Sequence, residues 1–445
     1  MTVSTASVPI IDEATAVEYA LQQREHDDAH RRAHGGAERR PLSHARVYAA
    51  LMALALGGFG IGSTEFVAMG LLPDIARDLL PGLYASDSEE AIGQSGWVIT
   101  AYALGVVVGA PTIAALAGRV PRRRLLLWLA AAFTLGTIAS ATLPTFELVI
   151  AARFVAGLPH GAYFGVAALV AASLMGPGKR GQGVALVLSG LTVATVIGVP
   201  IITAIGQIAG WRPAYLVVAA LFALTFVAVR ILVPWQPGDA NSTVRSELAA
   251  FGSGQVWVAV AVGAVGFGGF FAVYSYIAPM VTESAGLPGG AVPWILASTG
   301  IGLTIGNILG GRLADAGTAR AMFLGFCGLI GSLALLGLTG TTPVGLIAGT
   351  FLVGFTASII SPVVQTRLMD VAGKSQTLAA ALNHSALNVG NALGAFLGGL
   401  VVAAGWGYVT PAWVGLLLAI GGLLLALVSV ALERRAVLRR VTLSP

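Results

Sequence analysis

Twelve long apolar stretches constrain the fold of this chain more than any other feature. Each holds some 20 or more mostly apolar residues, and a helix of about that length crosses a hydrocarbon core about 30 Å thick. The stretches lie near residues 48–72, 96–118, 123–143, 146–174, 182–208, 211–233, 255–282, 289–314, 319–340, 343–368, 375–404 and 409–432. They are continuous and rich in Gly, Ala and Leu, which excludes the alternating pattern of a membrane β-barrel. The sequence therefore predicts an all-α membrane protein with twelve transmembrane helices.

Composition supports the same class. Charged residues make up 10% of the chain, against about 25% in a typical soluble domain. The 59 glycines suit the close helix packing that small residues allow in lipid. Cys327, the single cysteine, lies inside a predicted span and can form no internal disulfide.

The distribution of basic residues predicts the orientation in the membrane. Of the 25 Lys and Arg residues, the predicted outer loops hold only Arg77 and Arg212, and only Arg153 falls inside a span. Because basic loops stay in the cytoplasm, we expect a multi-pass plasma-membrane protein with both termini cytoplasmic. The net charge of +5 then reflects topology, and nucleic acid is not an expected partner.

Residues 1–47 differ in kind from the rest, because they are polar and contain no apolar segment of the signal-peptide type. We expect a disordered cytoplasmic tail. His26, His30 and His34 recur every four residues and could bind a metal on a helix, although a solvated tail is the preferred interpretation.

The remaining chain divides into two similar halves. Leu191–Gly198 reads LTVATVIG, and Leu387–Gly394 reads LNVGNALG 196 positions later. Ala117-Gly118-Arg119 likewise parallels Gly310-Gly311-Arg312, 193 positions later. Two six-helix repeats with a binding site between them are typical of secondary transporters. The expected divisions are a six-helix bundle at 48–233, a cytoplasmic linker at 234–254, a second bundle at 255–433 and a cytoplasmic tail at 434–445.

Two charges inside predicted spans are the candidates for proton coupling. Glu65 stands alone in FGIGSTEFVAMGLLP, and such a residue costs about 2.5 to 3.5 kcal/mol to insert. It lies about 12 Å along a helix from Pro73, and Arg153 lies about 13 Å from Pro144, so both are expected at similar depth. A permanent pair would only hold two helices together. A switchable pair would change the proton affinity of Glu65 between conformations, which is the function that we favour.

Several neighbouring side chains in span four are candidates for the same site. His160 follows Arg153 by seven residues, so the two share nearly one helical face. It could relay protons, bind substrate or simply form an interhelical contact. Tyr163 and Phe164, one turn further on, are candidates for lining the substrate cavity.

Polar residues in the second half predict a wall of the substrate site. His384, Asn388 and Asn391 share one face of span eleven, and Asn383 is adjacent. Ordinary interhelical hydrogen bonds are the alternative explanation of this stripe. Tyr274, Tyr276 and Gln365 are further candidates for substrate-binding groups.

Four motifs carry a resemblance to a known family. They are Ser63-Thr64-Glu65-Phe66 with Gly70-Leu71-Leu72-Pro73, Arg153-Phe154 with Gly157-Leu158-Pro159-His160-Gly161, Gly198-Val199-Pro200 with Gly210-Trp211-Arg212, and Gly311-Arg312-Leu313-Ala314-Asp315. With these motifs the chain resembles the major facilitator superfamily, in its twelve-span drug:proton antiporter branch. It is most similar there to the arabinose-efflux-permease and chloramphenicol-resistance exporters. The resemblance makes spans one and four neighbours, which would allow a direct or water-bridged contact between Glu65 and Arg153.

The resemblance also implies a set of gating residues. They are Arg119, Gly198, Pro200, Gly311, Arg312 and Asp315. Gly118 stands where the family usually has an Asp, so the gate in the first half is incomplete and the second copy, with Arg312 and Asp315, fits better. The usual Gly-Pro pair of span five is interrupted by Val199, and Ile202 stands where a small residue is common.

These features together predict a proton-coupled exporter of a small, weakly polar or amphipathic compound, such as a phenicol. Sequence signatures of an enzyme are lacking, and no GxxxxGK[ST] loop for ATP is present, so no cofactor beyond the proton gradient is expected. A proton symporter or facilitator for a sugar, nucleoside or other metabolite is the alternative, and a membrane receptor is a more distant one. The expected partners are the substrate, protons and lipid, with the chain acting as a monomer.

Overall fold

A computed structural model describes residues 43–176, 178–238, 254–372 and 376–442. The predicted tail at 1–47, with His26, His30 and His34, falls almost wholly outside the described residues, as does most of the linker at 234–254. Twelve helices among the described residues are long and apolar enough to cross a membrane, which confirms the predicted number and the all-α class.

The first six spans use the following elements. They are α2 (His44–Gly70), α5 (Ser88–Ser95) with α6 (Trp97–Ala117), α7 (Arg122–Thr142), α8 (Phe146–Gly157) with α9 (His160–Met175), α10 (Arg180–Val193) with a π-helical turn (Ala194–Gly198) and α11 (Val199–Ala209), and α12 (Trp211–Leu232). Two short helices, α3 (Leu72–Leu79) and α4 (Pro81–Ser86), join the first span to the second.

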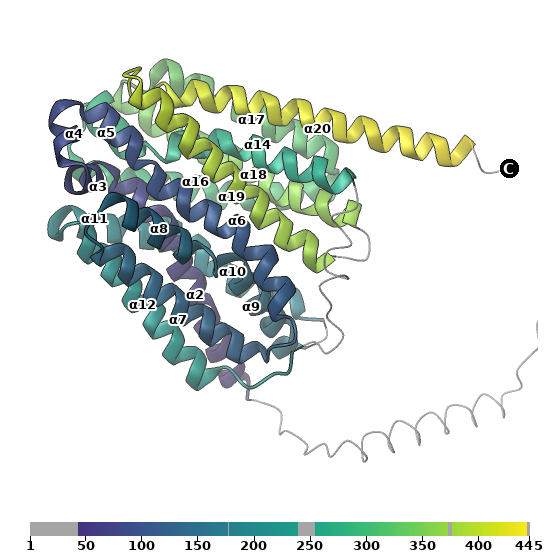
Figure 1. Cartoon of the computed structure of the whole chain (residues 1–445). Helices are drawn as coiled ribbons and strands as arrows, with labels where there is room; N and C mark the ends of the chain where they lie inside the picture. Colours follow the sequence, from purple (N-terminus) through teal and green to yellow (C-terminus); the bar gives the residue numbers. More distant parts are fainter. Residues whose placement is uncertain (1–42, 177, 239–253, 373–375, 443–445) are drawn as a thin grey trace, which may run out of the picture. The chain divides into compact units, whose positions relative to one another are not determined.

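The second half repeats this order. Its elements are α14 (Gly254–Tyr274), α15 (Ile277–Pro279) with a π-helical turn (Met280–Ser284), a 3₁₀ turn (Gly289–Ala291) with α16 (Val292–Ala316), α17 (Thr318–Thr339), α18 (Pro343–Ala372), α19 (Gln376–Ala403) and α20 (Pro411–Thr442). In Figure 1 the purple-to-teal helices of the first half and the green-to-yellow helices of the second half form two groups.

Three spans differ from the continuous helices that the sequence predicts. Span two begins eight residues early, with α5 capped by the Asp87 side chain. Span four breaks between Gly157 and His160, where Pro159 supplies no backbone N–H for the helical ladder. Span seven stops at Tyr274 and continues as short turns, so the predicted helix at 255–282 is too long.

Within each half, close helix contacts depend on small residues. A Cβ atom added to Gly105 of α6 would lie 2.1 Å from the Phe154 carbonyl oxygen of α8. A Cβ added to Gly157 of α8 would meet the Tyr102 carbonyl oxygen at 2.1 Å. The two backbones therefore touch, as expected for helices packed through small residues in lipid.

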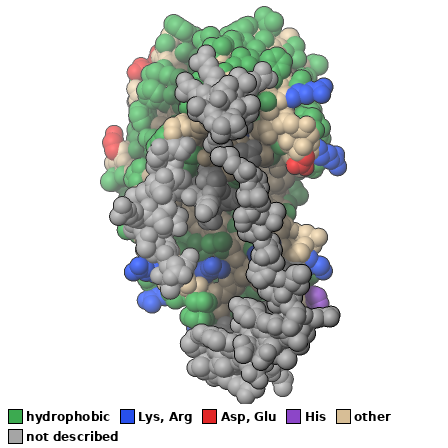
Figure 2. Space-filling model, turned by 90° about the vertical axis from the view of Figure 1, so that its right-hand side faces the viewer, with side chains coloured by type: hydrophobic (Ala, Val, Ile, Leu, Met, Phe, Trp, Pro, Cys, Tyr) green, Lys and Arg blue, Asp and Glu red, His purple; other side chains and the backbone are tan. Residues whose placement is uncertain are grey.

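Charge separates the two ends of the helix bundle. The end where α6 leads into α7 carries basic residues, among them Arg122, Arg124 and Lys179, and we call it the basic end. Figure 2 shows Lys and Arg side chains around the edge of this end. The opposite end, with α3 and α4, carries Asp74 and Asp87 among other acids, and we call it the acidic end.

Candidate functional site

Glu65 lies at a contact between the two halves. It belongs to α2, and only 5% of the residue is exposed. Asn391 of α19 donates a hydrogen bond of 3.1 Å from Nδ2 to Glu65 Oε1. A carboxylate from the first half is therefore held by an amide from the second half.

Arg153 is fully buried and makes all its contacts inside the first half. Its Nη1 and Nη2 atoms donate to Thr64 Oγ1 at 3.1 Å and to the Thr64 carbonyl at 3.0 Å. Its Nε donates to the Val98 carbonyl at 3.3 Å. The guanidinium also lies over the rings of Tyr102 and Tyr215, at 4.3 and 5.4 Å from their centres. The cation is thus stabilised by carbonyl dipoles and aromatic faces.

Of the two contacts expected between Glu65 and Arg153, direct or water-bridged, the direct ion pair is not formed among the described residues. Arg153 bonds instead to Thr64, the residue before Glu65. Successive residues of a helix point about 100° apart, so Arg153 and Asn391 approach α2 from different directions. The Arg153 charge nevertheless remains within electrostatic reach of the Glu65 carboxyl.

The structure brings His160 and His384 together across the two halves. Their ring centres lie 6.4 Å apart, and each ring also packs against Phe164. Phe164 and His384 are stacked, with centres 5.4 Å apart and planes 6° from parallel. Tyr102 Oη lies 3.2 Å from His160 Nδ1, and the tautomer of the imidazole decides which group donates.

The aromatic candidates divide into packing residues and interface residues. Tyr163 donates a hydrogen bond of 3.1 Å to the Leu54 carbonyl, which directs it into the first half. Tyr276 donates one of 2.7 Å to the Ala395 carbonyl of α19, within the second half. Tyr274 meets Phe66 of the first half edge to face at 5.7 Å, and its buried hydroxyl has no hydrogen-bond partner.

The three asparagines of the polar stripe of α19 are buried, as its pattern predicts, and His384 is partly buried. Asn383, Asn388 and Asn391 are 2%, 4% and 0% exposed. Asn388 donates from Nδ2 to the His384 carbonyl at 3.0 Å. The Oδ1 atoms of all three asparagines are buried without a partner among the described residues. Gln365 of α18 is half-buried in the same half.

The predicted gating residues lie apart from this site. Arg119, Arg312 and Asp315 are exposed at the basic end. Gly198 packs against α2, because an added Cβ would lie 2.6 Å from the Phe59 ring and 3.0 Å from Ser63 Oγ. Pro200 is buried in α11, and Gly311 is half-buried in α16.

Several of the closest contacts between the halves lie toward the acidic end. Trp97 and Phe396 pack edge to face at 5.4 Å. Gln207 Nε2 donates to the Gly289 carbonyl at 2.8 Å. Near these groups, residues of both halves line a cavity of about 290 Å³ that includes Arg77 and Glu283. The structure therefore holds the two halves together at this end.

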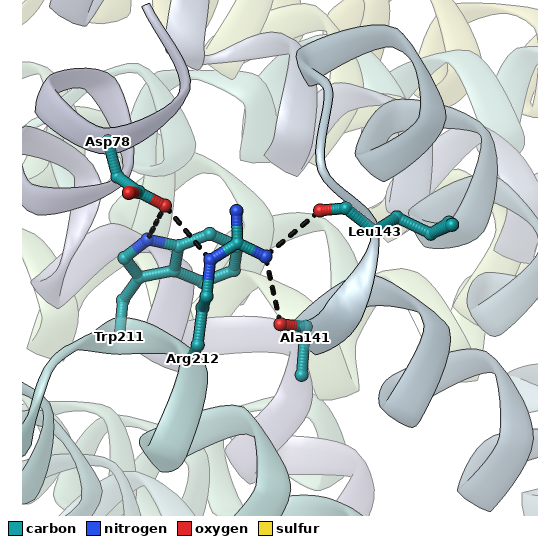
Figure 3. A network of polar contacts seen from close by, with 5 residues as sticks. All are labelled: Asp78, Ala141, Leu143, Trp211 and Arg212. Carbon is teal, nitrogen blue, oxygen red and sulfur yellow. Dashed lines mark hydrogen bonds and ion pairs between the residues drawn. The ribbon is translucent and has the colours of Figure 1, made fainter. Parts of the chain in front are cut away.

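A polar network also fixes the acidic end of the first half (Figure 3). Arg212 Nε donates to Asp78 Oδ2 at 3.0 Å, and Arg212 Nη1 donates to the Ala141 and Leu143 carbonyls at 2.9 Å. Trp211 Nε1 donates to the same Asp78 oxygen at 3.0 Å. The network joins α3, the end of α7 and the start of α12.

Sequence reasoning missed the partners of the two buried charges. Thr64 and Val98 hold Arg153 partly through backbone carbonyls, which leave no mark in a sequence. Asp78 was also missed, although its position two turns after Leu71 at the end of a span was a visible signal. Asn391 was recognised as polar and inward-facing, and its pairing with Glu65 depends on tertiary packing.

Comparison with known proteins agrees with this architecture. The family profile described as "Major Facilitator Superfamily" matches residues 54–293 and 260–442. The chain belongs to the major facilitator superfamily. The transporter is 37% identical over 361 residues to the inner membrane transport protein YdhP of Escherichia coli (strain K12), covering 80% of this chain and 90% of YdhP.

Two further similarities concern the family and the fold. The chain is 33% identical over 375 residues to a chloramphenicol resistance protein of Streptomyces lividans, covering 83% of this chain and 93% of the relative. A crystal structure of a D-xylose-proton symporter shares the fold, with a TM-score of 0.69 and 18% identity over 86% of this chain and 97% of the other. This transporter is accordingly a multi-pass protein of the plasma membrane.

Proposed function

We propose that this transporter is a proton-coupled efflux antiporter, which exports a small, weakly polar or amphipathic compound such as a phenicol-type drug. One observation carries the proposal. Glu65 is a buried carboxyl group inside a span, at a contact between the halves, and it is not neutralised by a direct ion pair. A carboxyl group in that position can gain and lose a proton as the halves move.

The surroundings of the proposed site favour an uncharged ligand. Around the contact between the halves lie the rings of Phe164 and His384 and the amide side chains of Asn383 and Asn388. An aromatic surface with a few placed polar groups suits a small amphipathic compound. The similarity to a chloramphenicol resistance protein points to the same class of substrate.

Alternating access between the two ends would carry the substrate outward in the proposed cycle. With the basic end toward the cytoplasm, contact of the halves at the acidic end leaves the substrate path closed to the outside. The substrate would then bind from the cytoplasm. Arg119, Arg312 and Asp315 at the basic end would take part in closing the opposite side of the path, while proton binding to Glu65 would return the transporter to its starting state.

Proton flux in proteoliposomes tests this function. The purified transporter is reconstituted with an imposed pH gradient and given chloramphenicol, sugars or nucleosides in turn. We expect chloramphenicol or a similar compound to trigger proton movement opposite to its own, and we expect Glu65→Gln to abolish it. Glu147→Gln is the matched control, because Glu147 is exposed at the start of α8.

Two outcomes would contradict the proposal. Substrate movement in the same direction as protons would make the protein a symporter for the sugar or nucleoside that triggers it. Proton-driven export by Glu65→Gln at the wild-type rate would remove Glu65 from the coupling mechanism.

A further inference from the structure

We infer that Asn391 senses the protonation state of Glu65, so that proton binding favours closure of the acidic end. This inference rests on the proposed function, since it explains how one carboxyl group would couple a proton to the movement of the two halves. The observation behind it is the hydrogen bond from Asn391 Nδ2 to Glu65 Oε1, which joins α19 to α2.

The Asn391 side chain is only half satisfied in this contact. Its Nδ2 atom has an acceptor in Glu65, whereas its Oδ1 atom is buried and has no partner among the described residues. An ionised carboxylate only accepts hydrogen bonds, so it has nothing to offer this oxygen. A buried acceptor without a donor is costly, which makes the contact weaker than an amide could provide.

A proton on Glu65 would complete the pair. A carboxylic acid presents one O–H donor beside one acceptor oxygen, and a primary amide presents an N–H donor beside its own acceptor. The protonated Glu65 can therefore donate to Asn391 Oδ1 while it still accepts from Nδ2. The number of hydrogen bonds between Glu65 and Asn391 rises from one to two, and the cost of a buried carboxylate is removed.

The other charged or titratable groups around Glu65 belong to three neighbouring helices. Arg153, Tyr102 and Tyr274 lie within electrostatic reach of the carboxyl, from α8, α6 and α14. Tyrosine stays neutral between pH 5 and about 9. Tyr215 of α12 contacts Arg153 and follows the same rule.

Two histidines on neighbouring elements require a separate control. His160 begins α9, and His384 lies two turns before Asn391 on α19. An imidazole titrates in the same pH range as a buried carboxyl group, so either histidine could add its own pH response. A response that comes from the histidines would persist when Glu65 can no longer ionise.

Closure of the acidic end on proton binding has the direction that a proton-coupled antiporter requires. Protonation from outside would strengthen the contact between α2 and α19 inside the membrane, which holds the halves together, so the protonated transporter would stay closed at the acidic end and open to the cytoplasm. Loss of the proton inside would leave Asn391 Oδ1 without a donor and weaken the same contact. Each cycle would then carry a proton inward, opposite to an exported substrate.

The test measures the opening of the acidic end without any substrate. Ala85 of α4 and Thr341, between α17 and α18, are exposed at that end and can each be replaced by cysteine in a Cys327→Ser background. Spin labels at these positions report the distance between the halves by double electron–electron resonance. The protein is held in lipid nanodiscs at pH values from 5 to 9.

For the wild type we expect the closed population to grow as the pH falls. One additional buried hydrogen bond corresponds to a change of about two- to tenfold in the ratio of closed to open molecules. Glu65→Gln should be closed at every pH, because its amide offers a donor and an acceptor as the protonated acid does. Asn391→Leu should lose the part of the pH response that comes from the second hydrogen bond.

Two more variants separate this role from simple packing. Asn391→Asp places a second carboxyl group against Glu65, so charge repulsion at high pH should open the acidic end and increase the pH response beyond that of the wild type. Ser385→Ala removes a buried hydroxyl six residues earlier on the same helix, which has no hydrogen-bond partner among the described residues, and should keep a pH-dependent distance.

The inference would be overturned if Asn391→Leu kept the wild-type pH response, or if Glu65→Gln kept it or stayed open at all pH values. These outcomes are separate from failure of the proposed function. A pH response through Glu65 and Asn391 with no export of any compound would leave the inference standing and contradict the exporter. Proton-coupled export together with an unchanged pH response in Asn391→Leu would support the exporter and overturn the inference.

Discussion

Replacement of Arg212 by alanine should destabilise the first half more than any single surface ion pair would suggest. The guanidinium makes one charged contact with Asp78 and two hydrogen bonds with the Ala141 and Leu143 carbonyls at the end of α7. The ion pair is partly exposed and contributes about 0.2 to 1 kcal/mol. Two hydrogen bonds from a charged donor, reduced for solvent exposure, bring the total to roughly 2 to 3 kcal/mol.

Thermal unfolding in detergent measures this loss. If the first half unfolds as one unit, a loss of 2 to 3 kcal/mol lowers Tm by roughly 4 to 12 °C. Arg77→Ala is the matched control, because Arg77 also pairs with a carboxylate of α3, at 3.2 Å from Asp74, but with an exposed side chain. Its expected cost is about 0 to 0.5 kcal/mol.

Arg212→Lys adds a second comparison. A lysine keeps the charge but lacks the planar guanidinium that reaches three acceptors at once. The loss of stability in Arg212→Lys should therefore lie between the losses in Arg77→Ala and Arg212→Ala. An Arg212→Ala variant no less stable than Arg77→Ala would refute the reasoning. The carbonyl contacts at the end of α7 would then contribute nothing measurable.

Two other predictions concern the acidic end and its contact with the second half. Gly300→Val should force the halves apart, because an added Cβ would lie 2.5 Å from the Thr195 carbonyl oxygen of the other half. The labelled distance at the acidic end should lengthen, whereas Gly331→Val, where nothing lies within 4 Å, should leave it unchanged. Burial raises the pKa of the Asp74 carboxyl above its usual range, although Arg77 opposes the shift. The folded state therefore binds this proton more tightly than the unfolded state, so the stabilisation is present at low pH and is lost as the pH rises through the raised pKa. Asp74→Asn should flatten this part of the pH dependence of Tm, and an unchanged slope would count against the assignment.

Hydropathy was sufficient to predict the number and type of the helices. A lipid-exposed backbone must satisfy its hydrogen bonds within each segment, so a long apolar stretch can hardly become anything but a helix. The interruptions were harder to predict. Pro159 marks a position where the helix of span four is interrupted. The end of α14 at Tyr274 has no such proline, because Pro279 comes five residues later.

The candidate site was predictable to a lesser degree. The sequence identified Glu65, Arg153 and Asn391 as polar groups that must face inward, and all three are buried. It placed the two opposite charges at similar depth and favoured a switchable contact between them. The structure instead satisfies Arg153 with Thr64 and a carbonyl, which a residue pattern cannot reveal.

The repeated motif explains why an amide stands opposite the carboxyl group. When LTVATVIG is aligned with LNVGNALG, Asn391 corresponds to Thr195. Both positions lie at the contact between the halves, Thr195 beside Gly300 and Asn391 beside Glu65. The threonine hydroxyl bonds back to its own helix, at 2.9 Å from the Thr192 carbonyl, so only its backbone approaches the other half. A longer amide reaches across the interface, and it does so in the copy of the motif that faces an ionisable group. The two halves thus share an interface position, and the side chain of the second-half copy hydrogen-bonds across it to Glu65.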